Sequence, residues 1–288
     1  MLSRELEALP EFSDKEYVRW QTILEERTGI SFFQHKSILQ KGLSLRMRET
    51  GVTDYDQYFR QVSAVPDGLV EWMQLVDRVS VKETSFFRDA GSFAVVRDFL
   101  LDRIGKTAAA TNPNLDIWSV GCATGEEAYS LAMTAVDIVD YLAAPCFVGV
   151  TATDISSTAL AVAKKGCYSQ HRLNELLPAT KNKYFVRQGN GDFEVAANLR
   201  QRMCFVQDNI LGLDVVPGIE MDVIYCQNVL IYFRRELQEE VLNTLTKCLK
   251  PGGLLIVGPG DAMGWKHPLM NRISDLKIQA YTRRANNS

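Results

Sequence analysis

Long hydrophobic runs are missing from this sequence. No stretch approaches the roughly 18–20 consecutive apolar residues that a membrane helix needs. The opening segment MLSRELEALPEFSDKEY also has no apolar core of the kind that signal peptides carry. We therefore expect a cytoplasmic protein with no membrane-spanning helix.

Clustered metal ligands are missing as well. The chain has six cysteines but no Cys-x-x-Cys pair, and it has only three histidines. A zinc site would need such ligands close together in sequence. We expect neither a metal site nor disulfides, and we interpret the cysteines as small buried side chains in a reducing compartment.

Neither sign of charge is in large excess. The chain contains 35 acidic and 32 basic residues, which gives a net charge of −3. This balance gives no reason to expect a nucleic-acid partner, so any electrostatic docking must come from a local patch. With 288 residues and 46% hydrophobic content, the chain is long enough for two globular units.

The first 75 residues show only helical periodicity. Ser13 and Glu16 form a capping box before a helix that Gly29 ends. Three further helices are predicted, over 36–49, from Asp54 onward and over about 67–79. The last of these is expected to bury Leu69 and Val79.

From about residue 115, strands and helices alternate. Strands are predicted over 116–120, 146–154, 202–207, 221–226, 254–258 and 276–283. Helices are predicted over 125–142, from Ser156 to Gly166, and over 234–249, where Pro251-Gly252-Gly253 closes the last one. This order is typical of a doubly wound, Rossmann-like α/β domain with a mostly parallel sheet.

One stretch breaks the alternation. The turn Gly189-Asn190-Gly191-Asp192 lies between two short apolar segments and indicates a hairpin. We expect a small antiparallel β-subdomain inserted at about 184–201. The predicted organisation is a helical domain over 1–75, a linker and helix over 76–114, and the α/β domain over 115–288.

The loop after the first strand is the first candidate ligand site. A doubly wound sheet binds its ligand outside the carboxyl ends of the strands, where Gly121 and Gly125 allow close backbone approach. The loop is not a G-x-G-x-x-G, which disfavours a pyrophosphate and hence a dehydrogenase. Glu126 and Glu127 would repel phosphate but attract an ammonium or sulfonium group.

The second strand ends at Asp154, whose carboxylate can accept hydrogen bonds from both hydroxyls of a ribose. Alone, the glycine loop could be a tight turn and Asp154 a helix cap. Together, at corresponding strand ends, they favour an adenosine-like ligand with a cationic, phosphate-free tail, such as S-adenosylmethionine. Asn228, at the end of a later strand, could contact the ligand or form a turn.

Several long motifs, in order over nearly the full length, resemble the CheR family of chemotaxis receptor methyltransferases. They are VSVKETSFFRD (79–89), IWSVGCATGEEAYSLAM (117–133), VTATDIS (150–156), CFVQDNIL (204–211), DVIYCQNVLIYF (222–233) and KCLKPGGLLIVG (247–258). The resemblance implies a class I S-adenosylmethionine-dependent methyltransferase fold with an all-α N-terminal substrate-docking domain. It also implies transfer of a methyl group to glutamate side chains of a methyl-accepting chemosensory receptor, with S-adenosylhomocysteine as product.

The resemblance also implies roles for individual residues. Thr84 and Arg88 would close over the cofactor and its reactive methyl, and Tyr232 would lie at the methyl-transfer centre. Arg88 and Tyr232 would be the catalytic residues, and Lys82 would be a further cofactor contact. Glu126 or Glu127 would hold the methionine amino group, with a slight preference for Glu126. The remaining cofactor contacts would be Gly121 in the loop, Asp154 at the ribose, Asn209 and Ile210 at the adenine, and Gln227 and Asn228 near the methionine end.

The sequence departs from the family pattern in three places. Gln227 occupies a position where the family usually has arginine, and Gly258-Pro259-Gly260-Asp261 replaces Gly-His-Ser-Glu. These changes suggest a divergent, PilK-like branch that serves a chemosensory system other than flagellar chemotaxis. The turn at 189–192 is shorter than in members that bind a receptor tail peptide, which predicts tail-independent docking.

The second predicted helix carries Lys36, Lys41, Arg46 and Arg48. This basic patch would steer the enzyme, expected to be a monomer, to the acidic helices of a receptor. On residues alone it could equally be a solvated basic face. Two other functions stay open: a methyltransferase that acts on another protein or a small molecule, and a non-catalytic scaffold.

Overall fold

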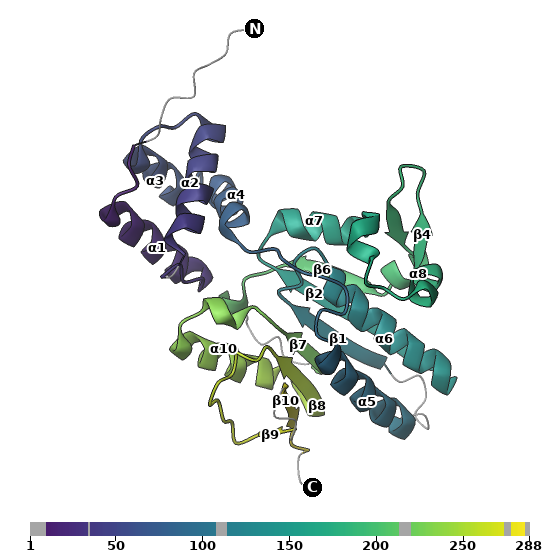
Figure 1. Ribbon diagram of the computed structural model, residues 1–288. Helices are drawn as coiled ribbons and strands as arrows, with labels where there is room; N and C mark the ends of the chain where they lie inside the picture. The colour runs from purple at the N-terminus through teal and green to yellow at the C-terminus, as the bar shows by residue number, and fades with distance from the viewer. Residues whose placement is uncertain (1–9, 34, 108–113, 213–219, 274–277, 286–288) are drawn as a thin grey trace. The chain divides into compact units, whose positions relative to one another are not determined.

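The computed structural model describes residues 10–33, 35–107, 114–212, 220–273 and 278–285. The chain forms two compact units, Met1–Val81 and Lys82–Ser288 (Figure 1). The boundary expected near residue 75 would cut helix α4 (Leu69–Val79). The division instead follows that helix, after Val81, because the helix continues to Val79 as part of the first unit.

The first unit is helical, as predicted. Its other helices are α1 (Asp14–Thr28), α2 (Lys36–Thr50) and α3 (Tyr55–Ser63). Ser13 Oγ accepts a hydrogen bond from Glu16 N at 3.2 Å, which confirms the predicted start of α1. Gly29 ends this helix with a φ of 75°, the left-handed conformation that glycine adopts without strain.

The core of this unit lies between α1, α2, α3 and α4, and its central side chains have no exposed surface. They are Trp20, Leu24, Leu39, Leu43, Met47, Tyr58 and Leu75. The prediction for Leu69 was wrong, because the first turn of α4 lies at the surface and leaves this side chain 56% exposed. The close contact is at the other end of the helix, where a Cβ on Gly42 would lie 2.6 Å from Val79 Cγ1.

The second unit is built on a seven-stranded sheet in the order β6-β2-β1-β7-β8-β10-β9 (Figure 1). Its parallel strands are β6 (Met203–Gln207), β2 (Phe147–Asp154), β1 (Asn114–Val120), β7 (Met221–Cys226) and β8 (Leu249–Val257). Strands β10 (Gln279–Arg283) and β9 (Met270–Arg272) are antiparallel. Because β2 and β7 flank β1 on opposite sides, the topological switch point lies at β1 and β7, which confirms the predicted doubly wound architecture.

Four long helices pack on this sheet and place the site loops. They are α5 (Ala90–Thr107), α6 (Glu126–Leu142), α7 (Ser157–Lys165) and α10 (Arg235–Lys247). Ser156 Oγ accepts a hydrogen bond from Ala159 N, which confirms the predicted cap of α7. The buried core joins α5 and α6 to strands β1, β2 and β7.

The sheet differs from the prediction at β8. The segment Pro251-Gly252-Gly253 lies inside this strand instead of closing the preceding helix. The pairing with β7 shifts register between Met221 and Val223, and a Cβ on Gly253 would lie 2.8 Å from Lys250 O. The glycines therefore allow an irregularity within a strand. Of the predicted last strand, residues 276 and 277 lie outside the described residues, and the rest forms β10.

The inserted subdomain is a three-stranded antiparallel sheet in the order β3-β5-β4. The predicted hairpin is confirmed as β4 (Phe185–Arg187) and β5 (Phe193–Val195). Strand β3 (Cys167–Tyr168) was not predicted, because two residues give no periodicity. Between β3 and β4 lie the 3-10 helix η1 (Gln170–Leu173) and α8 (Pro178–Tyr184), and the short α9 (Ala197–Arg200) follows β5.

Candidate functional site

The loop after β1 and the end of β2 are in direct contact. Gly121 N and Cys122 N donate hydrogen bonds to Thr153 O at 2.8 and 2.9 Å. Ala123 N donates to Asp154 Oδ2 at 2.8 Å. The two candidate elements that the sequence placed at neighbouring strand ends therefore form one site, at the edge where a doubly wound sheet binds its ligand.

The two loop glycines are required by their surroundings. Gly121 has a φ of 72°, and a Cβ there would lie 2.3 Å from Val229 Cγ2, in the loop after β7. Gly125 has a φ of 95°, and its Cβ would lie 2.8 Å from Ala163 Cβ on α7. Side chains at these positions would force the loop away from its neighbours. The glycines thus hold the loop close to both adjacent segments.

The two glutamates that follow have different environments. Glu126 is fully buried, with Oε1 accepting from Arg172 Nη1 and Oε2 accepting from Thr124 Oγ1 at 2.6 Å. Glu127 is partly exposed and accepts a hydrogen bond from Ser119 Oγ at 2.7 Å. The slight preference for Glu126 as the ligand contact stays a prediction; of the two carboxylates Glu127 is the more accessible, because Glu126 has no exposed surface and is paired with Arg172.

Burial raises the pKa of Glu127 to about 8. The neighbouring charges of Asp154 and Asp261 act in the same direction, and the Ser119 hydrogen bond and the Arg88 charge oppose them. A carboxyl group in this state gains from a cation placed beside it. The Glu127 carboxyl group and its acidic neighbours therefore fit a ligand with a positively charged tail.

The end of β6 adds a third segment to the site. Asp208 N donates to Asp154 O at 3.1 Å, which places the following residues beside the end of β2. Asn209 and Ile210 are both half-buried there, and Asn209 Oδ1 accepts from Leu211 N at 3.1 Å at the start of the 3-10 helix η2 (Ile210–Gly212). Both candidate adenine contacts therefore lie next to the candidate ribose contact.

Gln227, after β7, is a buried bridge to α5. Its Nε2 donates to Ser92 Oγ at 2.7 Å and to Asp89 Oδ2 at 3.1 Å, and its Oε1 accepts from Tyr225 OH at 2.8 Å. Asp89 in turn accepts from Gly91 N at the start of α5. The Gln227 amide thus supports the start of α5, and its expected place near the methionine end of the cofactor stays a prediction. Sequence reasoning missed Asp89 and Ser92.

The backbone of Asn228 is fixed by a hydrogen bond to Asp261. It adopts a φ of 58°, and its N–H donates to Asp261 Oδ2 at 3.1 Å. Gly258 N donates to the same oxygen at 3.0 Å. Asp261 is fully buried, and burial raises its pKa. The segment that departs from the family pattern therefore supplies the carboxylate that fixes the loop carrying Asn228.

The TSFFR segment is anchored by its phenylalanines. Phe86 is buried, and its ring packs edge-to-face against Tyr168 and Phe185 with centroid distances of 5.1 and 5.4 Å. Phe87 N donates to Ser130 Oγ at 3.0 Å, and Phe87 has a positive φ of 51°. These contacts fix the segment against α6 and the small sheet.

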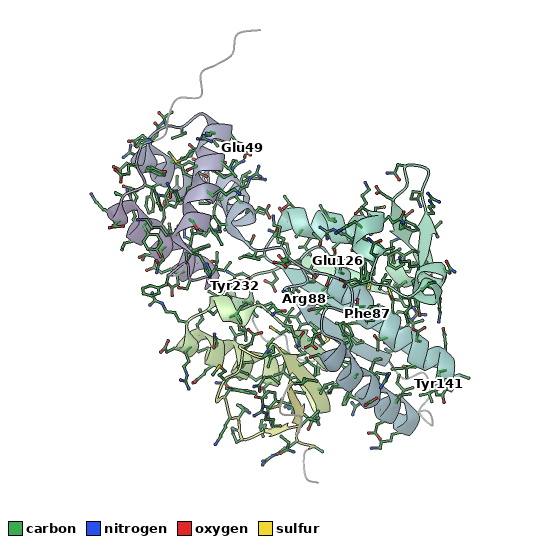
Figure 2. The ribbon with its side chains drawn as sticks, viewed as in Figure 1. Glu49, Phe87, Arg88, Glu126, Tyr141 and Tyr232 are labelled. Atoms are coloured by element: carbon green, nitrogen blue, oxygen red, sulfur yellow. The ribbon has the colours of Figure 1, made fainter. Side chains whose placement is uncertain are left out.

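Arg88 and Tyr232 share the site with Glu127. Arg88 is exposed, and its Nη1 donates to Glu83 O at 3.0 Å. Tyr232 is half-buried on the 3-10 helix η3 (Leu230–Tyr232); burial raises its pKa, and the Arg88 charge acts against that rise. The Arg88 charge also lowers the pKa of Glu127. Figure 2 shows Arg88 and Tyr232, which come from the linker and from η3.

The first residues of the linker lie on the α7 side of the site. Lys82 Nζ donates to Thr158 Oγ1 at 2.9 Å, in the first turn of α7. Thr84 is half-buried two residues further on. The linker therefore runs from its contact with α7, the helix after Asp154, to Arg88 in the site.

The expected basic patch on α2 is smaller than predicted. Lys36 Nζ pairs with Asp14 Oδ1 at 2.5 Å. Arg46 is bidentate to Glu71, with distances of 3.0 and 2.5 Å, and its side chain is only 13% exposed. It also pairs with Glu49, labelled in Figure 2. Lys41 and Arg48 are exposed, and their spacing of two helical turns puts them on one face.

Comparison with known families agrees with this division into two units. A model described as the CheR methyltransferase, SAM binding domain, matches residues 82–279, and one described as the CheR methyltransferase, all-alpha domain, matches residues 15–80. The chain belongs to the CheR methyltransferase family. The two CheR domains coincide with the two compact units of the structure.

The CheR chain is also similar to curated relatives over most of its length. It is 32% identical over 266 residues to the chemotaxis protein methyltransferase of Klebsiella aerogenes, with 90% of this chain and 87% of the relative covered. It is 33% identical over 255 residues to that of Escherichia coli, with 86% and 85% covered. It is 30% identical over 255 residues to chemotaxis protein methyltransferase 1 of Pseudomonas aeruginosa, with 87% and 91% covered.

The CheR assignment makes the chain a methyltransferase that uses S-adenosylmethionine. The site fits that cofactor, because Glu127 gains from a cation and Asp154 lies at the strand end beside it. Within the described residues, no group of histidine, cysteine or acidic side chains could hold a metal ion. No helix of the described segments is long and apolar enough to cross a membrane.

Proposed function

We propose that this enzyme transfers the methyl group of S-adenosylmethionine to glutamate side chains of a methyl-accepting chemosensory receptor. The products are a glutamate methyl ester and S-adenosylhomocysteine. The names of the relatives support a role in chemotaxis. The observation that carries the proposal is the pair Arg88 and Tyr232, which lie within electrostatic range of each other, with Arg88 also acting on Glu127.

This reaction needs orientation more than proton transfer. When bound, S-adenosylmethionine supplies a methyl group that is already activated by the sulfonium. A glutamate carboxylate, with a reference pKa near 4.3, is anionic at neutral pH and needs no general base. Positioning of the reactants can contribute about 7–11 kcal/mol to lowering a barrier of this kind. The chain must therefore hold two reactants in line.

The cofactor-binding roles follow from the strand ends. Asp154 accepts hydrogen bonds from the ribose hydroxyls, and Asn209 and Ile210 frame the adenine. Glu127 pairs with the ammonium of the methionine tail, which relieves the unfavourable burial of its own charge. Lys82 and Thr84 close over the cofactor, the backbone of Gly121 lies beside it, and Asn228 lies near its methionine end.

Arg88 and Tyr232 act on the incoming carboxylate. The exposed guanidinium of Arg88 attracts the substrate anion. The hydroxyl of Tyr232, with its raised pKa, stays protonated and donates a hydrogen bond. Because opposite charges cancel as the methyl moves, contacts that bind the carboxylate too tightly would slow the reaction. One exposed cation and one neutral donor suit that requirement.

Docking of the receptor is assigned to the α2 face that carries Lys41 and Arg48. Receptor glutamates lie on acidic helices, and exposed basic side chains favour encounter with such a surface. Lys36 and Arg46 contribute less, because both are already paired. We place the enzyme in the cytoplasm at receptor arrays, as a monomer that binds no nucleic acid.

The test is transfer of labelled methyl from S-adenosylmethionine to the signalling domain of a candidate receptor, followed by alkali. Carboxyl methyl esters release methanol in base, whereas N-methyl products keep the label. Label that is stable to alkali, or label on other proteins or small molecules only, would assign a different substrate. Cofactor binding without transfer to any acceptor would favour a scaffold.

A further inference from the structure

The inserted subdomain contacts the cofactor loop through three polar interactions. Arg172, on η1, donates from Nη1 to Glu126 Oε1 and to Thr124 Oγ1, the latter at 2.9 Å. Tyr168 OH, on β3, donates to Thr124 O at 2.7 Å. Residues 168–172 thus hold residues 124–126 from outside the parallel sheet.

The pairing of Arg172 with Glu126 is unequal in burial. The Glu126 side chain has no exposed surface, whereas that of Arg172 is 43% exposed. A buried carboxylate is costly unless it is paired and hydrogen-bonded. Glu126 has two partners, Arg172 and Thr124, and Arg172 is its cation. The conformation of the loop at the start of α6 therefore depends on a residue from the inserted subdomain.

This conformation also sets the position of the next residue. Glu127 follows Glu126 in the first turn of α6. Gly125 lies close to both α7 and β3, because a Cβ on it would lie 2.8 Å from Ala163 Cβ and 3.0 Å from Tyr168 OH. A displacement of Glu126 would therefore carry the Glu127 carboxylate with it.

We propose that Arg172 is a positioning residue for cofactor binding, which acts through Glu126 and Thr124 to fix the loop and the Glu127 carboxylate. The inference rests on the cofactor site assigned above, in which Glu127 pairs with the ligand ammonium. It does not depend on the identity of the methyl acceptor. The small sheet is then part of the cofactor site, in addition to any role in docking.

The matched control is Arg200, from the same subdomain. Its Nη2 pairs with Glu194 Oε1 at 2.7 Å, and its side chain is 36% exposed, close to the exposure of Arg172. Its Nε donates to Val195 O at 3.0 Å. Arg200→Met therefore breaks an ion pair of similar exposure in the subdomain without removing a contact to the cofactor loop.

The experiment is titration calorimetry of the full chain with S-adenosylhomocysteine. Arg172→Met should raise the Kd about tenfold, the effect of losing one hydrogen bond to a charged group. Arg200→Met should leave the Kd unchanged, and Arg172→Lys, which keeps a cation beside Glu126, should restore most of the affinity. With a receptor substrate, the loss should appear in KM for the cofactor and leave kcat at saturation.

A second variant covers the case in which Arg172→Met fails to fold. Arg172→Met with Glu126→Gln leaves no buried charge, so it should fold, yet it should still bind weakly because the contacts to the loop are gone. Binding by this double variant at the level of the unaltered protein overturns the inference, as does equal weakening by Arg200→Met. If the unaltered protein does not bind S-adenosylhomocysteine, the cofactor-site assignment itself fails and the inference with it.

Discussion

Cofactor affinity should depend on pH through Glu127. In the ligand-free protein the pKa of Glu127 is raised to about 8. Below that pH the group holds a proton, which a cationic ligand must displace to pair with the carboxylate. About one molecule in a hundred is ionised at pH 6 and about one in eleven at pH 7, so affinity should rise about ninefold between them.

The size of the expected change in binding free energy decides which measurement is informative. At pH 7, ionising Glu127 costs about 1.4 kcal/mol, one pKa unit. A hydrogen bond to a charged group contributes about 1.5–3 kcal/mol. The gain from this hydrogen bond exceeds the cost of ionising Glu127 by at most about 1.6 kcal/mol at pH 7. Glu127→Gln should therefore weaken binding no more than about 15-fold at pH 7 and hardly at all at pH 6. The slope with pH is therefore more diagnostic than affinity at one pH.

The assay is calorimetric titration with S-adenosylhomocysteine from pH 6 to pH 7. Over this range an α-ammonium with a reference pKa of about 7.7–8.0 stays largely protonated, so the slope reports the protein. Glu127→Gln should flatten the slope. The control is Glu239→Gln, which alters an exposed glutamate on α10 whose partner Arg235 lies 3.7 Å away. Parallel slopes for Glu127→Gln and the unaltered protein would refute the pairing of Glu127 with the ligand.

Three further predictions concern other parts of the molecule. Arg88→Ala should fold normally and bind cofactor, yet lose about a hundredfold in turnover; near-normal turnover would remove Arg88 from the mechanism. Gly121→Ala should lower the melting temperature and abolish tight cofactor binding, because a Cβ there meets Val229 at 2.3 Å. Gly51→Ala, with a nearly identical φ of 73° and open space around it, should cost only the backbone strain of about 1–3 kcal/mol. Reversing Lys41 and Arg48 to glutamate should slow receptor methylation at low salt, leave cofactor Kd unchanged, and lose its effect as salt rises; equal rates at low salt would exclude docking through this face.

Sequence predicted the features that local chemistry decides. Ser13, Ser156 and the glycines after helices mark element ends because their side chains or their φ values satisfy the terminal backbone groups. The meeting of the 121–127 loop with Asp154 was also predictable, because parallel strands present their carboxyl ends at one edge. The doubly wound sheet followed from the alternation of strands and helices.

Sequence could not show which of the two glutamates is buried and paired. Glu126 and Glu127 are neighbours on one helix, so their side chains point about 100° apart and only the surroundings choose between them. The deciding residue, Arg172, lies 46 residues away on the inserted subdomain. Arg46 was misjudged for the same reason, because its partner Glu71 lies 25 residues away on another helix. Partners of this kind exist only once the chain has folded.

Two of the departures from the family pattern bear on whether the site remains catalytic. At the position where the family usually has arginine, the Gln227 amide bridges β7 to Asp89 and Ser92 at the start of α5. In the 258–261 segment, the Asp261 carboxylate accepts the N–H groups of Asn228 and Gly258. Both changes therefore fall on residues that support the loops from behind. The groups that would meet cofactor and substrate, Glu127, Asp154, Arg88 and Tyr232, are all present, and a scaffold with no need to bind S-adenosylmethionine would have no reason to retain a buried support for them.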